Sequence, residues 1–200
     1  MLLREYPLFY FLWKETIAMA QYTGKFTRRT NRPSAGNKWY THTSYGGYSN
    51  CTTNLGTRAF KGATIYNCVG YCWGRYWEAQ AQNGRLLGYS DPSTIRDVFE
   101  WRCNGDPPVA WNALKSNGFW RDYCKSYPVK GAIAFYKKNS NSKKGHVSFV
   151  EKVYSNGRVD FSNCNYSTKP LWSYQTNVNP NGSFGGYTLL GYLHPIVKFN

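Results

Sequence analysis

Long apolar runs are absent from this sequence of 200 residues. No window approaches the roughly 20 apolar residues that a membrane-spanning helix requires, so we expect no transmembrane span. The apolar stretch at 8–13 and the small residues at 18–20 give only a weak secretory signal, because Lys14 and Glu15 interrupt the stretch early. Met19 is an alternative natural start, which would place the residues before it outside the native protein.

Acidic residues are also scarce, with 10 Asp and Glu against 25 Lys and Arg, which leaves a net charge of +15. Such a charge attracts polyanions, whether nucleic acid, anionic lipid or the anionic polymers of a cell wall. Proteins that recognise nucleic acid usually carry their basic residues on one helix or in a recognisable module, and the sequence shows neither. We therefore expect no specific nucleic-acid partner. The basic clusters at 25–38 and 137–144 are either solvated surface or a site that attracts polyanions.

Patterns typical of metal sites are missing as well. The cysteines form no paired CxxC spacing and only three histidines accompany them, so we expect no structural zinc. A chain of this length buries enough apolar surface to fold without cross-links, which favours free thiols over disulfides. The six cysteines are Cys51, Cys68, Cys72, Cys103, Cys124 and Cys164.

No internal repeat divides the chain, but its composition changes near residue 36. Up to that point the sequence is basic and lacks apolar periodicity after Trp13, whereas from Trp39 onward it is uniformly rich in aromatic residues. We expect one compact domain over residues 37–200. Residues 1–36 are expected to form a basic extension that is partly disordered or begins before the natural start.

Helical patterns occupy the first half of this domain. An amphipathic pattern predicts a helix over residues 67–82, with Cys68 in its first turn. A second helix is expected at 93–99. A third is expected over 106–117, because an aspartate stands at its cap position and Pro107 at its first helical position.

Strand patterns follow Pro128. The dipeptide Asn156-Gly157 lies between two of the expected strands and is a strong signal for a tight hairpin. Helices followed by an antiparallel sheet predict an α+β domain. The expected strands are 129–136, 146–154 and 158–163, with weaker candidates at 171–175 and 187–193.

One cysteine and one histidine stand in positions suited to nucleophilic chemistry. A helix N-terminus favours the thiolate, and Cys68 is the one cysteine at the start of a convincing helix. Histidine is the usual general base near neutral pH. His146 opens a strand directly after Gly145, where a missing side chain would leave room for a substrate, whereas His42 lies in a loop and His194 near the chain end. For a single cysteine a buried packing role is more common, so this pair alone decides nothing.

Four blocks of sequence resemble the CHAP domain, the cysteine, histidine-dependent amidohydrolase/peptidase of phage endolysins, tail-associated lysins and bacterial wall hydrolases. NCVGYCWGR at 67–75 resembles its nucleophile motif, and P-x-x-GAIA at 128–134 its strand before the histidine. GHVSFVEKV at 145–153 resembles its histidine strand, and SNCNY at 162–166 the segment of its third residue. The blocks appear in the family's order over residues 37–195, and several together are far more specific than one.

This resemblance implies a papain-like or NlpC-like α+β fold, with N-terminal helices packed on an antiparallel sheet. It implies Cys68 as nucleophile, His146 as base and Asn163 as the residue that orients the imidazole, without a cofactor. The substrate would be an amide bond in the peptide part of peptidoglycan, cut by an N-acetylmuramoyl-L-alanine amidase or an endopeptidase.

The resemblance also implies where the protein acts and with what. It would act at the bacterial cell wall, as a phage-encoded lysin that is released or carried on the virion, or as a secreted enzyme. Peptidoglycan is the expected partner, and anionic wall polymers and other lysin or tail subunits are further candidates.

The sequence departs from the common family pattern at three places. Asn163 stands where many relatives have glutamate, and an amide holds the imidazolium less strongly than a carboxylate does. Cys72 replaces a small apolar residue, and packing is its more common role, although oxidation could join it to Cys68. Some relatives bind calcium through aspartates before the nucleophile, but residues 52–67 contain no acid, so we expect no metal site.

The hairpin at 156–157 leaves two candidates for the third residue. In a tight two-residue turn, His146, Asn163 and Asn165 all project from one face of the sheet. Asn163 would then lie about 13 Å along the strand from His146, whereas Asn165 would be diagonal to it. A wider loop or a bulge would reverse this preference. Ideal geometry therefore favours Asn165 and the resemblance favours Asn163.

Two other functions fit parts of the pattern. An NlpC/P60-type peptidase also pairs a helix cysteine with a strand histidine, but it usually carries a second histidine in the adjacent strand, and residues 160–165 contain none. The second alternative is a non-catalytic basic module that binds the cell wall or nucleic acid and whose pocket catalyses no reaction. Replacement of Cys68 by alanine separates these classes, because it would abolish hydrolysis and leave binding intact.

Overall fold

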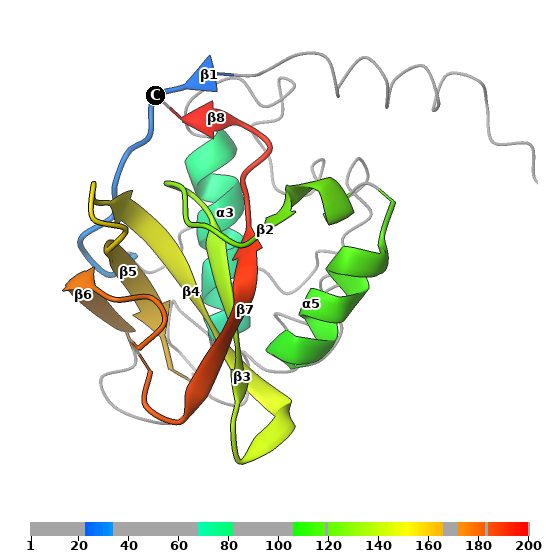
Figure 1. Cartoon of the computed structure of the whole chain (residues 1–200). Coiled ribbons are helices and arrows are strands. Elements are labelled where there is room, and N and C mark those ends of the chain that lie inside the picture. Colours follow the sequence, from blue (N-terminus) through cyan, green and yellow to red (C-terminus); the bar gives the residue numbers. More distant parts are fainter. Residues whose placement is uncertain are drawn as a thin grey trace, which may run out of the picture.

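A computed structural model of the chain describes residues 23–33, 68–81, 106–118, 120–165, 172–182 and 184–199. The helices and strands within these ranges are shown in Figure 1. In chain order they are β1 (Thr23–Gly24), α3 (Cys68–Ala81), α5 (Pro107–Ser116), the 3-10 helix η1 (Trp120–Tyr123), β2 (Cys124–Lys125), β3 (Ile133–Lys138), β4 (Asn141–Val153), β5 (Val159–Cys164), β6 (Trp172–Val178), β7 (Tyr187–Leu193) and β8 (Lys198–Phe199).

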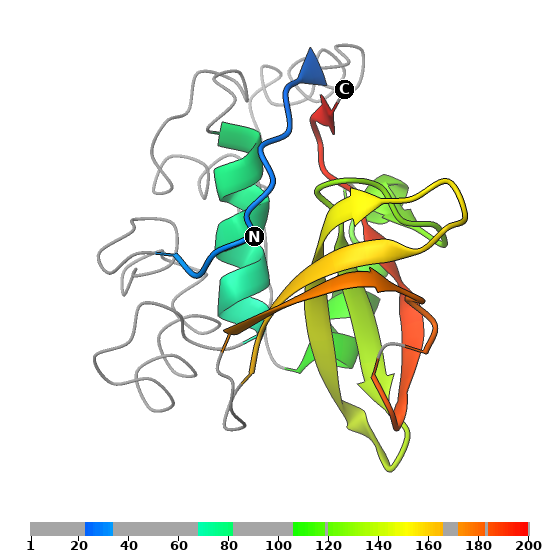
Figure 2. The same cartoon turned by 90° about the vertical axis from the view of Figure 1, so that its left-hand side faces the viewer.

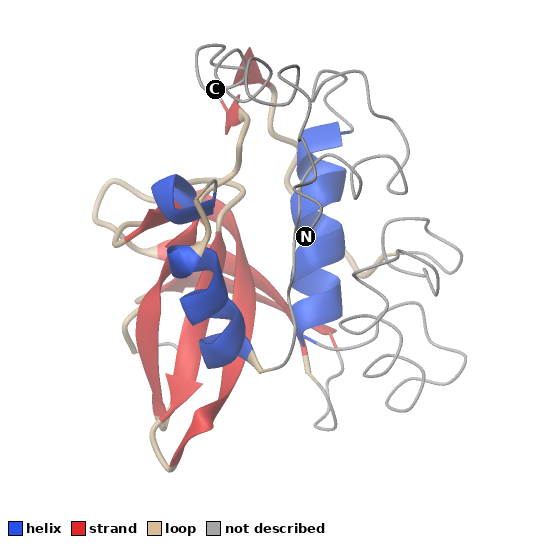
Figure 3. Ribbon diagram, turned by 90° about the vertical axis from the view of Figure 1, so that its right-hand side faces the viewer, coloured by secondary structure: helices blue, strands red, loops and turns tan. Residues whose placement is uncertain are grey.

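An antiparallel sheet of six strands, in the order β2-β7-β3-β4-β5-β6, forms the body of the fold. The short strands β1 and β8 pair in parallel, so that residues near the two ends of the chain lie side by side (Figure 1). Helix α3 contacts β4 and β5, and helix α5 contacts β3 and β4 (Figures 2 and 3). The predicted α+β fold is confirmed.

Helix α3 is enclosed on all sides. Every residue from Val69 to Gln80 is buried, including three aromatic rings that pack on one another in a chain. Trp73 stacks on Tyr76 with 5.6 Å between ring centroids, and Trp77 meets Trp73 edge-on at 4.8 Å. Apolar side chains cover most of the helix, which places it in the core. Its charged residues Arg75 and Glu78 are buried as an ion pair.

Helix α5 begins where the sequence predicts. Asp106 is its N-cap and Pro107 its first residue, where a missing amide hydrogen costs nothing. The Asp106 side chain does not cap the helix but accepts a hydrogen bond from Lys144 Nζ at 2.8 Å. Trp111 and Leu114 are buried against the sheet.

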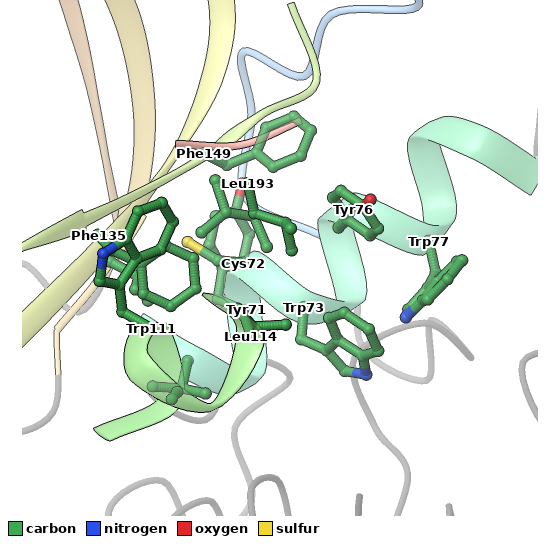
Figure 4. Packing of buried hydrophobic residues seen from close by; sticks show 14 of the residues in the cluster. Tyr71, Cys72, Trp73, Tyr76, Trp77, Trp111, Leu114, Phe135, Phe149 and Leu193 are labelled. Atoms are coloured by element: carbon green, nitrogen blue, oxygen red, sulfur yellow. The ribbon is translucent and has the colours of Figure 1, made fainter. Parts of the chain in front are cut away.

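The two faces of the sheet carry separate apolar clusters, because neighbouring residues of a strand point to opposite sides. Figure 4 shows the cluster on the helix side, where side chains of α3 and α5 meet Phe135, Phe149 and Leu193 from the strands. The second cluster contains Ala134, Tyr136, Val150 and Phe161 and faces away from the helices.

Several predicted boundaries are corrected. Residues 129–132 form a turn and not the start of a strand, since Ala132 N–H donates to the carbonyl of Val129 at 3.2 Å and Gly131 has φ 82°. The histidine strand begins earlier than predicted, at Asn141, because it forms a long hairpin with β3. Strand 187–193 is confirmed. The helix expected at 93–99 lies outside the described residues.

Candidate active site

Cys68 is the first residue of α3 and is half-buried. Three backbone N–H groups point at its sulfur, those of Cys68 itself, Val69 and Val147. These amides favour the thiolate, but burial outweighs them and raises the pKa of Cys68 to about 11. The helix start thus favours the thiolate as the sequence indicates, but the resting site holds a neutral thiol because burial has the larger effect.

His146 lies in β4 opposite Tyr136 and is half-buried. Its imidazole packs edge-on against the ring of Phe184, with 4.7 Å between centroids, and Tyr187 lies slightly farther away. Burial lowers the pKa of His146 to about 4, although its hydrogen bond with Asn163 acts in the opposite direction. At neutral pH the imidazole is uncharged and can accept a proton.

Asn163 is the side chain that the structure brings to this imidazole. Its Oδ1 lies 3.3 Å from His146 Nε2 and also accepts a hydrogen bond from Ser148 Oγ. Its Nδ2 donates to Gln175 Oε1 at 3.1 Å, which fixes the orientation of the amide. Because Oδ1 can only accept, Nε2 of His146 carries the hydrogen and Nδ1 is left with a lone pair.

The hairpin between β4 and β5 explains why Asn163 holds this position. The turn is wider than predicted, because Tyr154 N–H donates to the Arg158 carbonyl at 2.8 Å. A bulge between Val150 and Lys152 then shifts the pairing by one more residue. The tight-turn register expected from the sequence is wrong, and both departures bring Asn163 closer to His146.

In the observed register Phe149 pairs with Ser162, which places Asn163 next to Ser148 and diagonal to His146. His146 and Asn163 therefore share one face of the sheet, as predicted. Asn165 follows the last residue of β5, and its carbonyl lies 3.8 Å from Cys164 Sγ. A role for Asn165 in the site stays a prediction.

Cys68 and His146 are connected through the backbone of β4. Cys68 packs with the helix-side cluster, while His146 points from the opposite face of β4. The pairing of β4 with β5 ends at Phe149, and the amide of Val147 meets the sulfur. Cys68 is thus held by the residue that directly follows His146.

A family model for the CHAP domain matches residues 12–165 of the chain. The chain belongs to the CHAP-domain family. CHAP domains are generally amidases or peptidases, and their substrate is peptidoglycan. The match includes Cys68, His146, Asn163 and Asn165. Comparison with curated proteins and with solved structures gives no match.

Gly145 of this CHAP domain does not leave the space that its sequence position indicates. A Cβ there would lie 2.7 Å from Pro108 Cδ and still closer to the carbonyl oxygen of Tyr136. The missing side chain lets the start of α5 approach β4, so the proposed substrate space at Gly145 is a misinterpretation. Its role is close packing beside His146.

Sequence reasoning missed three partners of the site. Ser148 could have been found, since a residue two positions after His146 in a strand shares its face. Gln175 comes from β6, and the Val147 amide belongs to the backbone, so neither carries a signal in the sequence. Their positions depend on strand pairing.

The remaining predictions concern cysteines and metal. Cys68, Cys72, Cys124 and Cys164 are free, and Cys72 is buried in the core as its predicted packing role requires. The segment 52–67, where relatives carry calcium ligands, lies outside the described residues. Within the described part of the chain, no helix is long and apolar enough to cross a membrane.

Proposed function

We propose that this CHAP domain hydrolyses an amide bond in the peptide part of peptidoglycan through an acyl-enzyme on Cys68. The contact between His146 Nε2 and Asn163 Oδ1 carries this proposal, because it turns the basic Nδ1 away from Asn163. Cys68 supplies the nucleophile beside Val147, and the three amides around its sulfur are donors suited to an oxyanion. The site has a cysteine at the N-terminus of a helix and a His-Asn pair on strands of an antiparallel sheet. This combination fits the papain-like arrangement.

Each step transfers one proton. His146 Nδ1 takes the proton of the thiol as the sulfur of Cys68 attacks the amide carbon. The imidazolium then gives this proton to the departing amine, and a thioester remains. Water attacks the thioester while His146 accepts its proton, and the carbon–sulfur bond breaks to free the carboxylic acid. The imidazolium then returns the proton to the departing sulfur, which restores the thiol and the neutral imidazole. Since burial keeps both groups neutral at rest, proton transfer accompanies the attack and does not precede it.

The charge of the molecule supports a second part of the proposal, attraction to anionic wall polymers. A cleft of about 850 Å³ lies at the C-terminal end of β4, and Asp122 is its one acidic lining residue. Its lysines are Lys125, Lys130, Lys152 and Lys198. We propose action at the bacterial cell wall, as a phage lysin or a secreted hydrolase, with other lysin or tail subunits as candidate partners.

Digestion of purified peptidoglycan tests the reaction class. Amide cleavage releases new amino groups and no reducing sugar ends, and mass spectrometry of the soluble fragments then distinguishes an N-acetylmuramoyl-L-alanine amidase from an endopeptidase. Reducing ends without new amino groups would overturn the proposal, because they would mean that the glycan is cut.

A further inference from the structure

A single extra residue in β4 decides on which face of the sheet the side chain of Asn163 lies. Lys152 pairs with Asp160, whereas Val150 pairs with Phe161, so Glu151 is the residue of β4 that has no counterpart in β5. Beyond this bulge every pairing is shifted by one residue.

Without the bulge, the pairing of Lys152 with Asp160 would continue and place Asn163 opposite Phe149. Paired residues share a face, and Phe149 points into the helix-side cluster. Asn163 would then point toward α3, away from His146. The contact between Asn163 and His146 therefore requires the extra residue.

The side chain of Glu151 is held by four hydrogen bonds inside the protein, with only 1% of the residue exposed. Arg75 of α3 donates from Nε to Oε1 at 2.8 Å and from Nη2 to Oε2 at 2.9 Å. Ser162 Oγ of β5 donates to Oε1 at 2.7 Å. The backbone N–H of Arg29 donates to Oε2 at 3.0 Å. A carboxylate with this many donors cannot leave its place at low cost.

The N-terminal segment completes the charge balance around Glu151. Arg75 also donates to Glu78 at 3.1 Å, so one buried guanidinium faces two buried carboxylates. Arg29 supplies the second positive charge by donating to Glu78 from Nε at 3.0 Å and from Nη2. Arg75 in turn donates to the carbonyl of Thr27 at 2.6 Å. Residues 27–29 thus belong to the network that holds the bulge.

We propose that Glu151 is a positioning residue, whose anchored side chain keeps the bulge in β4 and thereby keeps Asn163 on the face of His146. This inference rests on the proposed function for its effect on catalysis, but the register that it explains can be measured without any activity. Glu151 does not touch the reacting atoms and acts through Asn163.

The variant Glu151→Gln tests this role with little change of shape. The glutamine has an amide nitrogen in place of one carboxylate oxygen. This nitrogen is a donor and cannot accept the hydrogen bonds of Arg75 and the Arg29 backbone, so the side chain is no longer anchored in this variant. We expect kcat to fall on the order of 100-fold with KM little changed, as for Asn163→Ala. The double variant Glu151→Gln/Asn163→Ala should be no slower than Asn163→Ala alone, because both changes remove the same contact.

Glu78→Gln is the matched control, since it removes a second buried carboxylate from the same network but lies in α3 and not in β4. We expect it to lower the melting temperature about as much as Glu151→Gln does, and to leave kcat within about threefold of the wild type. Equal losses of kcat in the two variants would overturn the proposal, because they would show a general effect on stability.

Cross-strand NMR contacts report the register directly. Backbone contacts between Val150 and Phe161 mark the bulged pairing, and we expect Glu151→Gln to replace them with contacts between Val150 and Ser162. Retention of the original contacts would overturn the proposal even if the protein proved to have no hydrolase activity. If Glu151→Gln does not fold, Ser162→Ala removes one bond to Glu151, and we expect about a tenfold loss of kcat together with partial loss of the Val150 contact. Full kcat and an unchanged register in that variant would equally contradict the proposal.

Discussion

The imidazole of His146 depends on one amide for its orientation. Asn163 accepts from Nε2 and is itself held by Ser148 and Gln175, so the ring is oriented by neutral side chains. An amide orients an imidazole but does not stabilise its charged form as a carboxylate would. Together with burial, this explains why the pKa of His146 falls to about 4.

This arrangement sets the pH dependence of the reaction. His146 must be uncharged to accept the thiol proton, so we expect kcat/KM to rise with pH through the His146 pKa, about 4, and to stay level through neutrality. Asn163→Asp should move this acid limb upward toward neutral pH, because a carboxylate favours the imidazolium. Rates on a soluble stem peptide from pH 3 to 9 give both curves. An acid limb near the ordinary histidine value of about 6.5 in the wild type would contradict the buried, neutral imidazole.

At the level of helices and strands, α5 and β4 pack closely at Gly145. The start of α5 lies against β4 at Gly145, where Pro107 and Pro108 fill the volume that a side chain would need. This contact joins the only described helix that starts with a proline to the strand that carries His146.

Gly145→Ala should therefore destabilise the fold. The added methyl group meets the backbone of β3 and the ring of Pro108, neither of which can move aside easily, so we expect a loss of about 2 kcal/mol in the free energy of unfolding. Gly118→Ala serves as control, because no atom lies within 4 Å of a Cβ there. Urea denaturation measures both, and equal stabilities would show that β4 and α5 are less tightly packed than described.

Much of the local structure could be predicted from the sequence, because its signals are local. The helix from Cys68, the Asp106-Pro107 start of α5 and the strand at 187–193 all agree with the structure, although the helix is buried all round and not amphipathic. The pairing that selects Asn163 could not be predicted. Glu151 resembles an ordinary charged strand residue, and its burial depends on Arg75 and Arg29, which are distant in sequence.

At the scale of the whole molecule, a net charge of +15 acts over distances that salt can screen. We expect the rate of cell-wall lysis to fall on the order of tenfold between about 0.01 M and 0.5 M salt, because attraction to anionic wall polymers weakens. Cleavage of a small uncharged stem peptide is the control and should change little over the same range. Equal salt dependence for both substrates would count against targeting by charge.

Segments near the two ends of the described chain also contact the rest of the molecule. Strand β1 pairs with β8, and Arg28 forms an ion pair with buried Asp160 of β5 at 3.3 Å. Residues 23–33 therefore contact the same α3 and β5 that build the site, although the sequence favours an extension there. The boundary at residue 37 stays a prediction, and the family match begins before it.

Replacement of Cys68 measures the central claim most directly, with Cys124→Ala as the matched control. Both thiols are free and half-buried, and burial raises the pKa of each to about 11, but only Cys68 meets the amide of Val147. We expect Cys68→Ala to lower the release of amino groups from peptidoglycan by at least about a thousandfold while wall binding persists, and Cys124→Ala to remain active. Full activity of folded Cys68→Ala would contradict the account.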